Sequence, residues 1–244
     1  MRISIELVPR NESDLRAQLA EVAAFPRVDT VNIPDIARFS LRSWQSCGAA
    51  RKQVAHAIPH LRAVDVDLTR PLQAGREFSS HGVDEVLVVA GDAPADMSRP
   101  VYATSTLDLI GKLRREHPEL KIYAAFDPYR QGFQAERTYA AQKLEAGATG
   151  LFTQPFFDVR LMEIVAEQLS GVEVFWGVTS VTSRRSQRYW QSRNRAVFPA
   201  SFEPSLEWNR RLACDALAFV EEQGGNIYFM PIRASITDYL HGIL

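Results

Sequence analysis

The sequence predicts a single-domain α/β protein, a (β/α)8 TIM barrel that extends over residues 1–244. Three observations support this fold class. Short β-branched or aromatic runs alternate with longer amphipathic stretches along the whole chain, which is typical of repeated βα units around a parallel sheet. Eight such units fit a chain of 244 residues. No linker, low-complexity tract or block of like charges divides the sequence.

The predicted strands are short and rich in Val, Ile, Phe and Tyr. In chain order they are "ISIELV" (3–8), "TVNIP" (30–34), "LRAVDVD" (61–67), "EVLVVAGD" (85–92), "KIYAAFD" (121–127), "GLFTQPFF" (150–157), "EVFWGVT" (173–179) and "IYFMP" (227–231). Because crossovers between parallel strands are right-handed, few other closed arrangements remain. The alternative is an open doubly wound sheet, but no G-x-G-x-x-G or G-x-x-x-x-G-K-[ST] motif follows the first strand.

Helical patterns between the strands have recognisable ends. We expect Asp158 to cap the helix in "DVRLMEIVAEQLSG" and Gly171 to end it. Gly147 ends the pattern "ERTYAAQKLEAGA" in the same way. Ser205 opens the helix in "SLEWNRRLACDALAFVEEQGG", which should end at Gly224. In a barrel built from such units, functional residues lie at the carboxyl ends of the strands.

Composition and charge exclude several classes of function. The sequence is 46% hydrophobic and 23% charged, and its net charge of -1 with a pI of about 6.5 argues against binding to nucleic acid or an anionic membrane. Cys47 and Cys214 form no C-x-x-C pair and the histidines form no H-E-x-x-H motif, so we expect no metal site. Without a signal sequence or a long apolar run, the chain is expected to be soluble and cytoplasmic. A homo-oligomer is compatible with this composition.

The first strand places a carboxylate inside the barrel. Ile3, Ile5 and Leu7 share the face that should meet the helices, whereas Glu6 lies on the opposite face. An unpaired carboxylate in such a place costs several kcal/mol unless it is protonated or hydrogen-bonded. The same environment raises its pKa, which suits a general acid near neutral pH. The alternative is a Glu paired with an Arg or Lys of the barrel.

An acidic residue also ends the fourth predicted strand. Asp92 in "AGD" is expected at the carboxyl end of strand 85–92, where the active sites of such barrels lie. The small residues Ala90 and Gly91 leave room for a ligand to approach. The alternative is an Asp that caps the following loop.

Gln154 lies among aromatic residues in the sixth strand. Alternation places it on one side with Phe152 and Phe156. A buried carboxamide needs several hydrogen-bond partners, so Gln154 is either satisfied by the fold or available to a ligand. Flat apolar walls and one amide suit a heteroaromatic ring such as a pterin or flavin. We expect Gln154, Glu6 and Asp92 to face one cavity.

The order and spacing of these segments resemble the methylenetetrahydrofolate reductase family. Its barrel begins with a Ser-Phe-Glu-Phe-type strand and carries a Gly-Asp at strand 4 and a Thr-Gln-Phe-Phe-Phe-Asp at strand 6. The corresponding segments here are "SIEL", "AGD" and "TQPFFD". The likeness covers nearly the whole chain and includes "PHL" (59–61), "VYAT" (101–104), "KLEAGA" (143–148) and "PIRA" (231–234).

The resemblance implies reduction of 5,10-methylenetetrahydrofolate to 5-methyltetrahydrofolate, a step of one-carbon metabolism and methionine biosynthesis. Electrons come from NADH or NADPH and normally pass through FAD. By this likeness Glu6 is the general acid that protonates the folate and helps open its five-membered ring to an electrophilic iminium. Asp92 stabilises cationic or proton-bearing states of the pterin. Gln154 hydrogen-bonds the pterin ring, Phe156 belongs to the substrate site and Arg233 contacts the folate.

The residues implied for FAD match the family in part. His60, Ala103 and Lys143 correspond to positions that contact FAD, and Gly91 with Asp92 corresponds to the Gly-Asp motif. These five are the cofactor residues that the resemblance implies.

Three other segments depart from the family pattern. The Thr-Tyr-Gly-Ala after strand 2 is "PDIA" here, the Arg before Gly-Asp is an alanine, and the Tyr-Pro-Glu-x-His loop after strand 5 is "FDPYRQ". The resemblance therefore leaves two routes for the hydride, through FAD or directly from the nicotinamide nucleotide.

Two other functions stay open. One is a non-catalytic folate- or flavin-binding barrel that acts as a subunit of a larger complex, and the retention of Glu6 argues against it. The other is a folate-linked methyltransferase barrel. Arg184 and Arg185 either hold the glutamate tail of the folate or begin a solvated helix.

Overall fold

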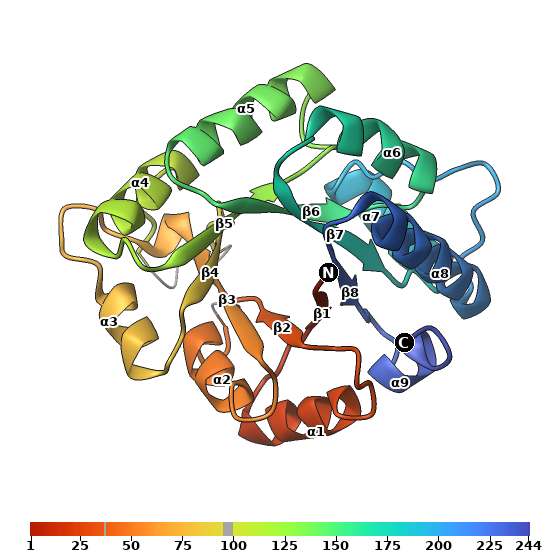
Figure 1. The fold of residues 1–244 in the computed structure, drawn as a ribbon, viewed down its shortest axis with the longest axis horizontal. Helices are drawn as coiled ribbons and strands as arrows, with labels where there is room; N and C mark the ends of the chain where they lie inside the picture. The colour runs from red at the N-terminus through yellow and green to blue at the C-terminus, as the bar shows by residue number, and fades with distance from the viewer. Residues whose placement is uncertain (37, 95–99) are drawn as a thin grey trace.

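Eight parallel strands close into a barrel in chain order, with β8 pairing with β1, as the sequence predicts. The computed structural model describes residues 1–36, 38–94 and 100–244. In Figure 1 the strands lie at the centre and helices surround them. The strands are β1 (Ile3–Glu6), β2 (Thr30–Ile33), β3 (His56–Arg62), β4 (Glu85–Val89), β5 (Lys121–Phe126), β6 (Gly150–Pro155), β7 (Glu173–Thr179) and β8 (Asn226–Met230).

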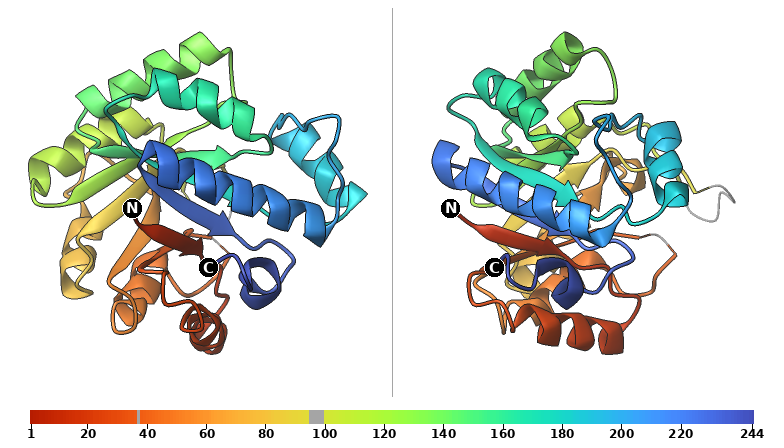
Figure 2. Two further views of the ribbon diagram at one scale, coloured as in Figure 1. Left: turned by 45° about the vertical axis from the view of Figure 1, so that its right-hand side comes forward. Right: turned by 90° about the vertical axis from the view of Figure 1, so that its right-hand side faces the viewer.

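Helices follow the strands on the outside of the barrel. They are α1 (Glu12–Val22), α2 (Ser43–Ala50), α3 (Gln73–Ser80), α4 (Thr106–Glu116), α5 (Phe133–Glu145), α6 (Val159–Gln168), α7 (Arg184–Arg193), α8 (Leu206–Gln223) and α9 (Ile236–Leu240). Figure 2 shows α7 apart from the surrounding helices, at the end toward which the strand arrows point. The predicted caps are confirmed, since Asp158 and Ser205 each accept a backbone hydrogen bond at the start of a helix. Gly224, with φ of 82°, ends α8 as predicted.

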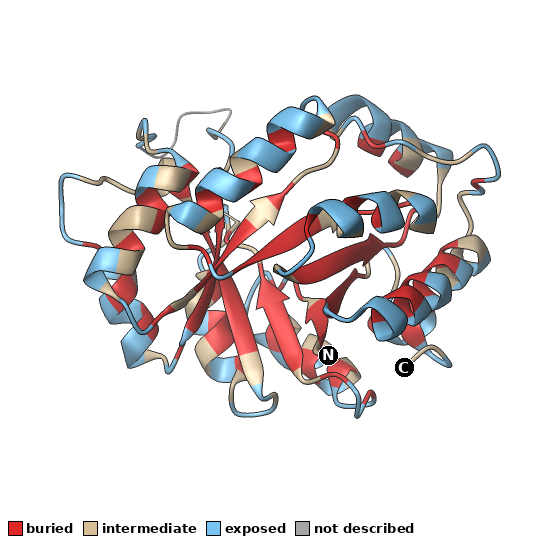
Figure 3. Cartoon of the chain, turned by 45° about the horizontal axis from the view of Figure 1, so that its top comes forward, coloured by how far each residue is buried: buried red, intermediate tan, exposed pale blue. Residues whose placement is uncertain are grey.

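The main apolar core lies between the sheet and the helices. Ile3, Ile5 and Leu7 are at most 2% exposed and belong to this core, which confirms the predicted outward face of β1. Figure 3 shows strands that are almost entirely buried and helices that are buried mainly on the side toward the barrel. Each fully buried Leu or Ile side chain contributes about 2 kcal/mol of transfer free energy, so this shell supplies most of the apolar stabilisation.

A second apolar cluster fills the middle of the barrel interior. The rings of Phe152 and Phe175 stack with centroids 4.2 Å apart, and Tyr123 packs edge-on against both. The whole cluster consists of inward-facing residues of β3 to β8: Ile58, Leu87, Tyr123, Phe152, Phe175, Tyr228 and Met230. Because this layer is packed, the ends of the barrel are the places where ligands can bind.

Ion pairs fill the end of the interior where the strands begin. Arg2 Nη1 lies 2.8 Å from Glu85 Oε2, and His56 Nδ1 lies 2.8 Å from Glu85 Oε1. Lys121 Nζ lies 2.8 Å from Glu173 Oε2. The carboxylates of this layer therefore have cationic partners, and we call these five residues the basal ion-pair layer.

The third strand was predicted wrongly. It runs from His56 to Arg62 rather than over 61–67, and residues 63–65 form a 3-10 turn. The apolar and acidic alternation of "AVDVD" is typical of a strand, whereas Pro59 in "HAIPHLR" lacks the N–H that a strand interior normally uses. Pairing with β2 and β4 overrides these local signals. As a result His60 lies within a strand of the barrel.

Three strands end at least two residues earlier than predicted. β1, β4 and β6 end at Glu6, Val89 and Pro155. Asp92 and Phe156 therefore lie beyond the strand ends, where the alternation of side chains no longer fixes their direction.

Candidate functional site

A cavity of about 310 Å³ opens at the end of the barrel where the strands finish. Glu6 from β1, His60 from β3 and Gln154 from β6 all line it, so the fold brings three of the predicted site residues together. Its volume is at the lower end of small-molecule sites. The full lining comprises Glu6, Pro34, His60, Leu87, Val89, Ala125, Phe152, Thr153, Gln154, Tyr189, Trp190, Asn194, Tyr228, Met230 and Ile232.

Glu6 supplies the carboxyl group of this cavity. Its Oε2 accepts a hydrogen bond of 3.0 Å from Asn32 Nδ2. Burial raises the pKa of Glu6 to about 7, and the Asn32 hydrogen bond offsets only part of that effect. Within the described residues, no Lys or Arg forms an ion pair with Glu6. A substantial fraction of Glu6 is therefore protonated at neutral pH, which is the state that a general acid needs.

Asn32 is fully buried in β2 and connects the polar side chains of the cavity. Its Oδ1 accepts a hydrogen bond of 2.8 Å from Ser4 Oγ, and its Nδ2 lies 3.2 Å from His60 Nε2. The parallel register of β1 and β2 pairs Asn32 with Glu6. Burial also lowers the pKa of His60 to about 3, so its ring is neutral near pH 7. Our sequence analysis missed Asn32, although a polar amide in the middle of the apolar run "TVNIP" was a visible signal.

Gln154 is partly exposed to the cavity. Over the described ranges of the chain, no side chain or backbone group hydrogen-bonds its carboxamide. The preceding residue differs, because Thr153 Oγ1 accepts from Gly177 N at 2.9 Å and the Thr153 carbonyl accepts from the Tyr228 hydroxyl. Gln154 is therefore positioned to exchange hydrogen bonds with a ligand, whereas Thr153 holds the strands together.

Phe156 does not share the side of Gln154, contrary to the prediction. It is fully buried in the core between the sheet and the helices, with its ring centroid 5.7 Å from that of Trp176. The register between β6 and β7 shifts between Phe152 and Pro155, which breaks the strict alternation on which the prediction depended. The structure therefore gives Phe156 a packing position outside the cavity.

Helix α7 lies at the end of the barrel where the strands finish (Figure 2) and contributes to the cavity lining. Tyr189 and Trp190 on this helix and Asn194 just after it line the cavity. Trp190 packs against the ring of Phe157 with centroids 5.6 Å apart and also contributes to the lining. Tyr189 is 59% exposed, so it lies at the edge between the cavity and solvent.

The Gly-Asp motif and Ala103 lie outside the cavity lining. Asp92 follows β4 and is exposed, and its backbone carbonyl accepts a hydrogen bond from Arg62. Gly91 has φ of 78°, and a Cβ there would come within 2.8 Å of the Arg62 side chain. Ala103 is exposed in the connection between β4 and α4. The expected cavity shared by Asp92, Glu6 and Gln154 is therefore present only for the last two.

Lys143 and Arg233 are also outside the lining. Lys143 is 3% exposed, and its Nζ donates a hydrogen bond of 2.6 Å to the Ala125 carbonyl and lies 3.6 Å from Glu136 Oε1. The ammonium group is thus paired within the fold. Arg233 is exposed after β8, in the left-handed region with φ of 59°.

The segment "PDIA" after β2 also contributes only in part to the cavity. Pro34 lines the cavity, whereas Asp35 is 5% exposed and forms an ion pair with Arg42. Ala37 lies outside the described residues. Because Pro34 has no donor and Asp35 and Lys143 are paired elsewhere, the described positions that correspond to flavin contacts do not form one surface that fits FAD.

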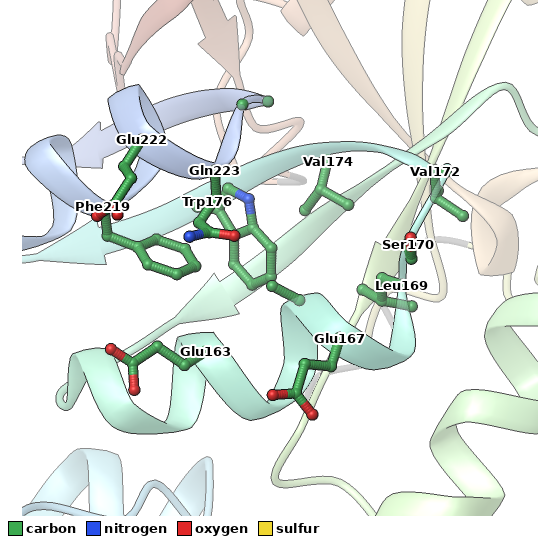
Figure 4. A pocket seen from close by; sticks show the side chains of 14 residues that line it. Glu163, Glu167, Leu169, Ser170, Val172, Val174, Trp176, Phe219, Glu222 and Gln223 are labelled. Carbon is green, nitrogen blue, oxygen red and sulfur yellow. The ribbon is translucent and has the colours of Figure 1, made fainter.

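A larger hollow of about 770 Å³ lies outside the barrel, between α6 and α8 (Figure 4). Trp176 and Phe219 contribute aromatic rings to it, and Glu163, Glu167 and Glu222 lie around them. None of the predicted site residues lines this hollow. We place the candidate site in the smaller cavity, because that cavity combines a carboxyl group of shifted pKa with an amide and an imidazole.

Metal-binding side-chain groups and membrane-spanning helices were also considered in the described residues. The described part of the chain contains no group of three or more His, Cys, Asp or Glu side chains that could hold a metal ion. None of the helices that the structure describes combines the length and apolarity needed to cross a bilayer.

Sequence comparison identifies relatives of this chain. A family model described as Methylenetetrahydrofolate reductase matches residues 17–211, a span that excludes Glu6 and Arg233. The chain is 24% identical over 149 residues to the 5,10-methylenetetrahydrofolate reductase of Escherichia coli (strain K12), covering 59% of this chain and 50% of that protein. It is 22% identical over 158 residues to that of Salmonella typhimurium strain LT2, covering 63% and 53%. The chain thus spans about half the length of the curated relatives that it matches.

Solved structures show the same architecture. A 2,3-dimethylmalate lyase of the PEP mutase/isocitrate lyase superfamily has a TM-score of 0.60 at 12% identity, with 96% of this chain and 75% of that chain covered. A dihydropteroate synthase from Thermus thermophilus has a TM-score of 0.53 at 16% identity, with 99% and 91% covered. At these identities the likeness shows only the barrel fold. The sequence match, in contrast, extends over most of the chain, and this protein therefore belongs to the methylenetetrahydrofolate reductase family.

Proposed function

We propose that this protein reduces 5,10-methylenetetrahydrofolate to 5-methyltetrahydrofolate with a hydride from NADH or NADPH. The main supporting observation is Glu6, a carboxyl group with a pKa of about 7 in a cavity at the functional end of the barrel. The names of the relatives, 5,10-methylenetetrahydrofolate reductase, support the same substrate.

Glu6 carries the proton in the proposed reaction. The protonated carboxyl donates its proton to a folate nitrogen, a C–N bond of the five-membered ring breaks, and an iminium forms. The Glu6 carboxylate left behind is a nearby negative charge that stabilises this cation. Hydride then adds to the iminium carbon and completes the methyl group, and Glu6 regains a proton from solvent. The substrate gains one proton and one hydride in total.

The other cavity residues bind and orient the substrate. The Gln154 carboxamide can donate to and accept from the edge of a pterin, and its lack of a partner among the described residues leaves both functions available. Phe152 and Tyr228 supply flat walls beside it. Asp92 and Arg233 are exposed outside the lining, so their predicted contacts with folate stay predictions and carry no step here.

We further propose that the hydride passes directly from the nicotinamide nucleotide to the folate. The positions that resemble flavin contacts support this route, because Lys143 forms an ion pair with Glu136 and Asp35 forms one with Arg42. Direct transfer uses the same proton from Glu6 and needs no step through a flavin.

A spectrum and an activity assay test the proposal together. The purified protein should show no flavin absorption in the visible range and should oxidise NADH or NADPH only when methylenetetrahydrofolate is present. A yellow protein that releases FAD would reject direct transfer. A colourless protein without turnover would reject the reductase proposal and favour the non-catalytic folate-binding barrel.

A further inference from the structure

The amide of Asn32 has a hydrogen-bond partner for each of its functional groups, although it lies in a strand with no access to water. Asn32 is 0% exposed. Its Oδ1 accepts from Ser4 Oγ at 2.8 Å, and its Nδ2 lies 3.0 Å from Glu6 Oε2 and 3.2 Å from His60 Nε2. Burying an amide is costly unless it is hydrogen-bonded, and an apolar side chain would serve the barrel equally well at this position. The arrangement therefore points to a role for the amide beyond packing.

The two hydrogens of the Asn32 amide have two different acceptors. One points to Glu6 and the other to His60 Nε2, so this ring nitrogen must carry a lone pair and the ring proton must be on Nδ1. In this orientation of the amide the Ser4 hydroxyl donates to Asn32 Oδ1. Burial keeps this imidazole neutral, and the Asn32 amide selects the neutral tautomer that has its proton on Nδ1.

Other titratable groups also surround Glu6. His60 on β3 and Tyr228 on β8 line the same cavity, and Asp127 follows β5. Tyr189 reaches the cavity from α7. None of these groups is cationic near neutral pH once His60 is held neutral, so the Asn32 amide is the polar contact that acts on the Glu6 carboxyl group.

We propose that Asn32 is a positioning residue for Glu6, which directs the carboxyl group into the cavity and fixes the tautomer of the neutral His60 beside it. This inference rests on the proposed function, since Glu6, the group that Asn32 positions, is the proton donor of the proposed reaction. A neutral amide stabilises the carboxylate that remains after proton transfer, but less strongly than a cation does. Glu6 is thus an acid that is protonated at rest and still able to release its proton.

Titration of Glu6 in the substrate-free protein tests the inference independently of turnover. The Glu6 carboxyl carbon can be followed by ¹³C NMR in wild type and Asn32→Leu, with Glu6→Gln used to assign the signal. Loss of the Asn32 donor should raise the midpoint of Glu6 by about one pH unit, and long-range ¹H–¹⁵N correlation should show that His60 no longer keeps its proton only on Nδ1. An unchanged midpoint together with an unchanged His60 tautomer would overturn the proposal.

Asn226 offers a matched control at the opposite end of the barrel. It is a 7% exposed Asn whose Nδ2 donates to Glu173 Oε1 at 3.1 Å and whose Oδ1 accepts from Arg2 N at 2.7 Å. Asn226→Leu should leave the Glu6 midpoint and the His60 tautomer as in wild type. An equal shift in both variants would show a general effect of core disruption and would overturn the specific role of Asn32.

Ser4→Ala keeps the test decisive if Asn32→Leu does not fold. Without the Ser4 hydroxyl the amide can turn over, so the Glu6 midpoint should rise by a smaller amount and His60 should show both tautomers. Where wild type is active, the base-side limit of the pH–rate profile, at which Glu6 loses its proton, should move with the titration. An inactive wild type with the expected titration shifts would reject the proposed function while the link from Asn32 to Glu6 stands.

Discussion

A buried carboxyl group has different neighbours, and a pKa shifted in the opposite direction, at the two ends of the barrel interior. At the end where the strands begin, Glu85 lies between Arg2 and His56. Burial raises the pKa of Glu85, but the hydrogen bond and charge of Arg2 together with His56 more than offset it, and the net pKa is lowered. At the other end Glu6 has the neutral Asn32 as its hydrogen-bond partner, and burial raises its pKa to about 7. The neighbouring group, rather than burial alone, decides whether the carboxyl group is charged.

A single strand supplies residues to both environments. Arg2, Ser4 and Glu6 alternate with the outward residues of β1, so they face the interior at successive levels. Arg2 and Glu6 are about 13 Å apart along the strand, at about 3.3 Å per residue. Arg2, just before β1, therefore stabilises the base of the barrel, whereas no described Lys or Arg side chain forms an ion pair with Glu6 at the functional end.

The largest expected effect is on turnover. Glu6→Gln preserves the shape of the side chain and removes the proton, so the rate of methylenetetrahydrofolate reduction at pH 7 should fall by about 10²- to 10⁴-fold. Oxidation of NADH or NADPH measures the rate, and circular dichroism checks that the fold is kept. Undiminished turnover in the folded variant would exclude Glu6 as the acid.

Glu85→Gln is the matched control for this variant. It should retain the turnover of wild type per folded molecule, because Glu85 lies at the end of the barrel away from the cavity. Its free energy of unfolding should fall by roughly 3 kcal/mol, since Arg2 loses the carboxylate that compensates its charge. Urea unfolding measures this loss, and a change below about 0.5 kcal/mol would show that the basal ion-pair layer is not a structural element.

A smaller effect concerns the pH dependence of stability. Between its ordinary value of 4.5 and the folded value of about 7, Glu6 binds more protons in the folded state than in the unfolded state. Its contribution to stability is therefore fully present below pH 4.5 and is lost as the pH rises through 7. The free energy of unfolding of wild type, compared with Glu6→Gln, should fall by roughly 2 to 3 kcal/mol between about pH 4.5 and 8.

Urea unfolding of both proteins at several pH values measures this difference. Glu85 should show the opposite sign, because its lowered pKa makes a contribution that is present above 4.5 and is lost as the pH falls. A constant difference between wild type and Glu6→Gln across this range would contradict the shifted pKa of Glu6.

Local patterns in the sequence were sufficient to predict the barrel and part of its site. Seven of the eight β runs, the caps at Asp158 and Ser205 and the inward direction of Glu6 depend on neighbouring residues and on the two-residue period of a strand. The placement of Gln154 in the same cavity as Glu6 followed from the order of the strands once the barrel was assumed.

The remainder of the site depends on contacts between distant segments. The contact of Asn32 with His60 requires the register of β2 against β3, which no local pattern encodes. The direction of Phe156 depends on an irregularity between β6 and β7. The position of α7 over the cavity results from aromatic packing such as that of Trp190, and its sequence shows only a polar helix.

The central claim is that a substantial fraction of Glu6 is protonated near neutral pH, because no Lys or Arg among the described residues forms an ion pair with it. A ¹³C NMR titration of the carboxyl groups in the wild-type protein tests this directly, with Glu6→Gln and Glu85→Gln used to assign the two signals. We expect a midpoint of about 7 for Glu6 and a midpoint below the ordinary 4.5 for Glu85. A Glu6 signal that titrates at or below 4.5, together with that of Glu85, would contradict the claim.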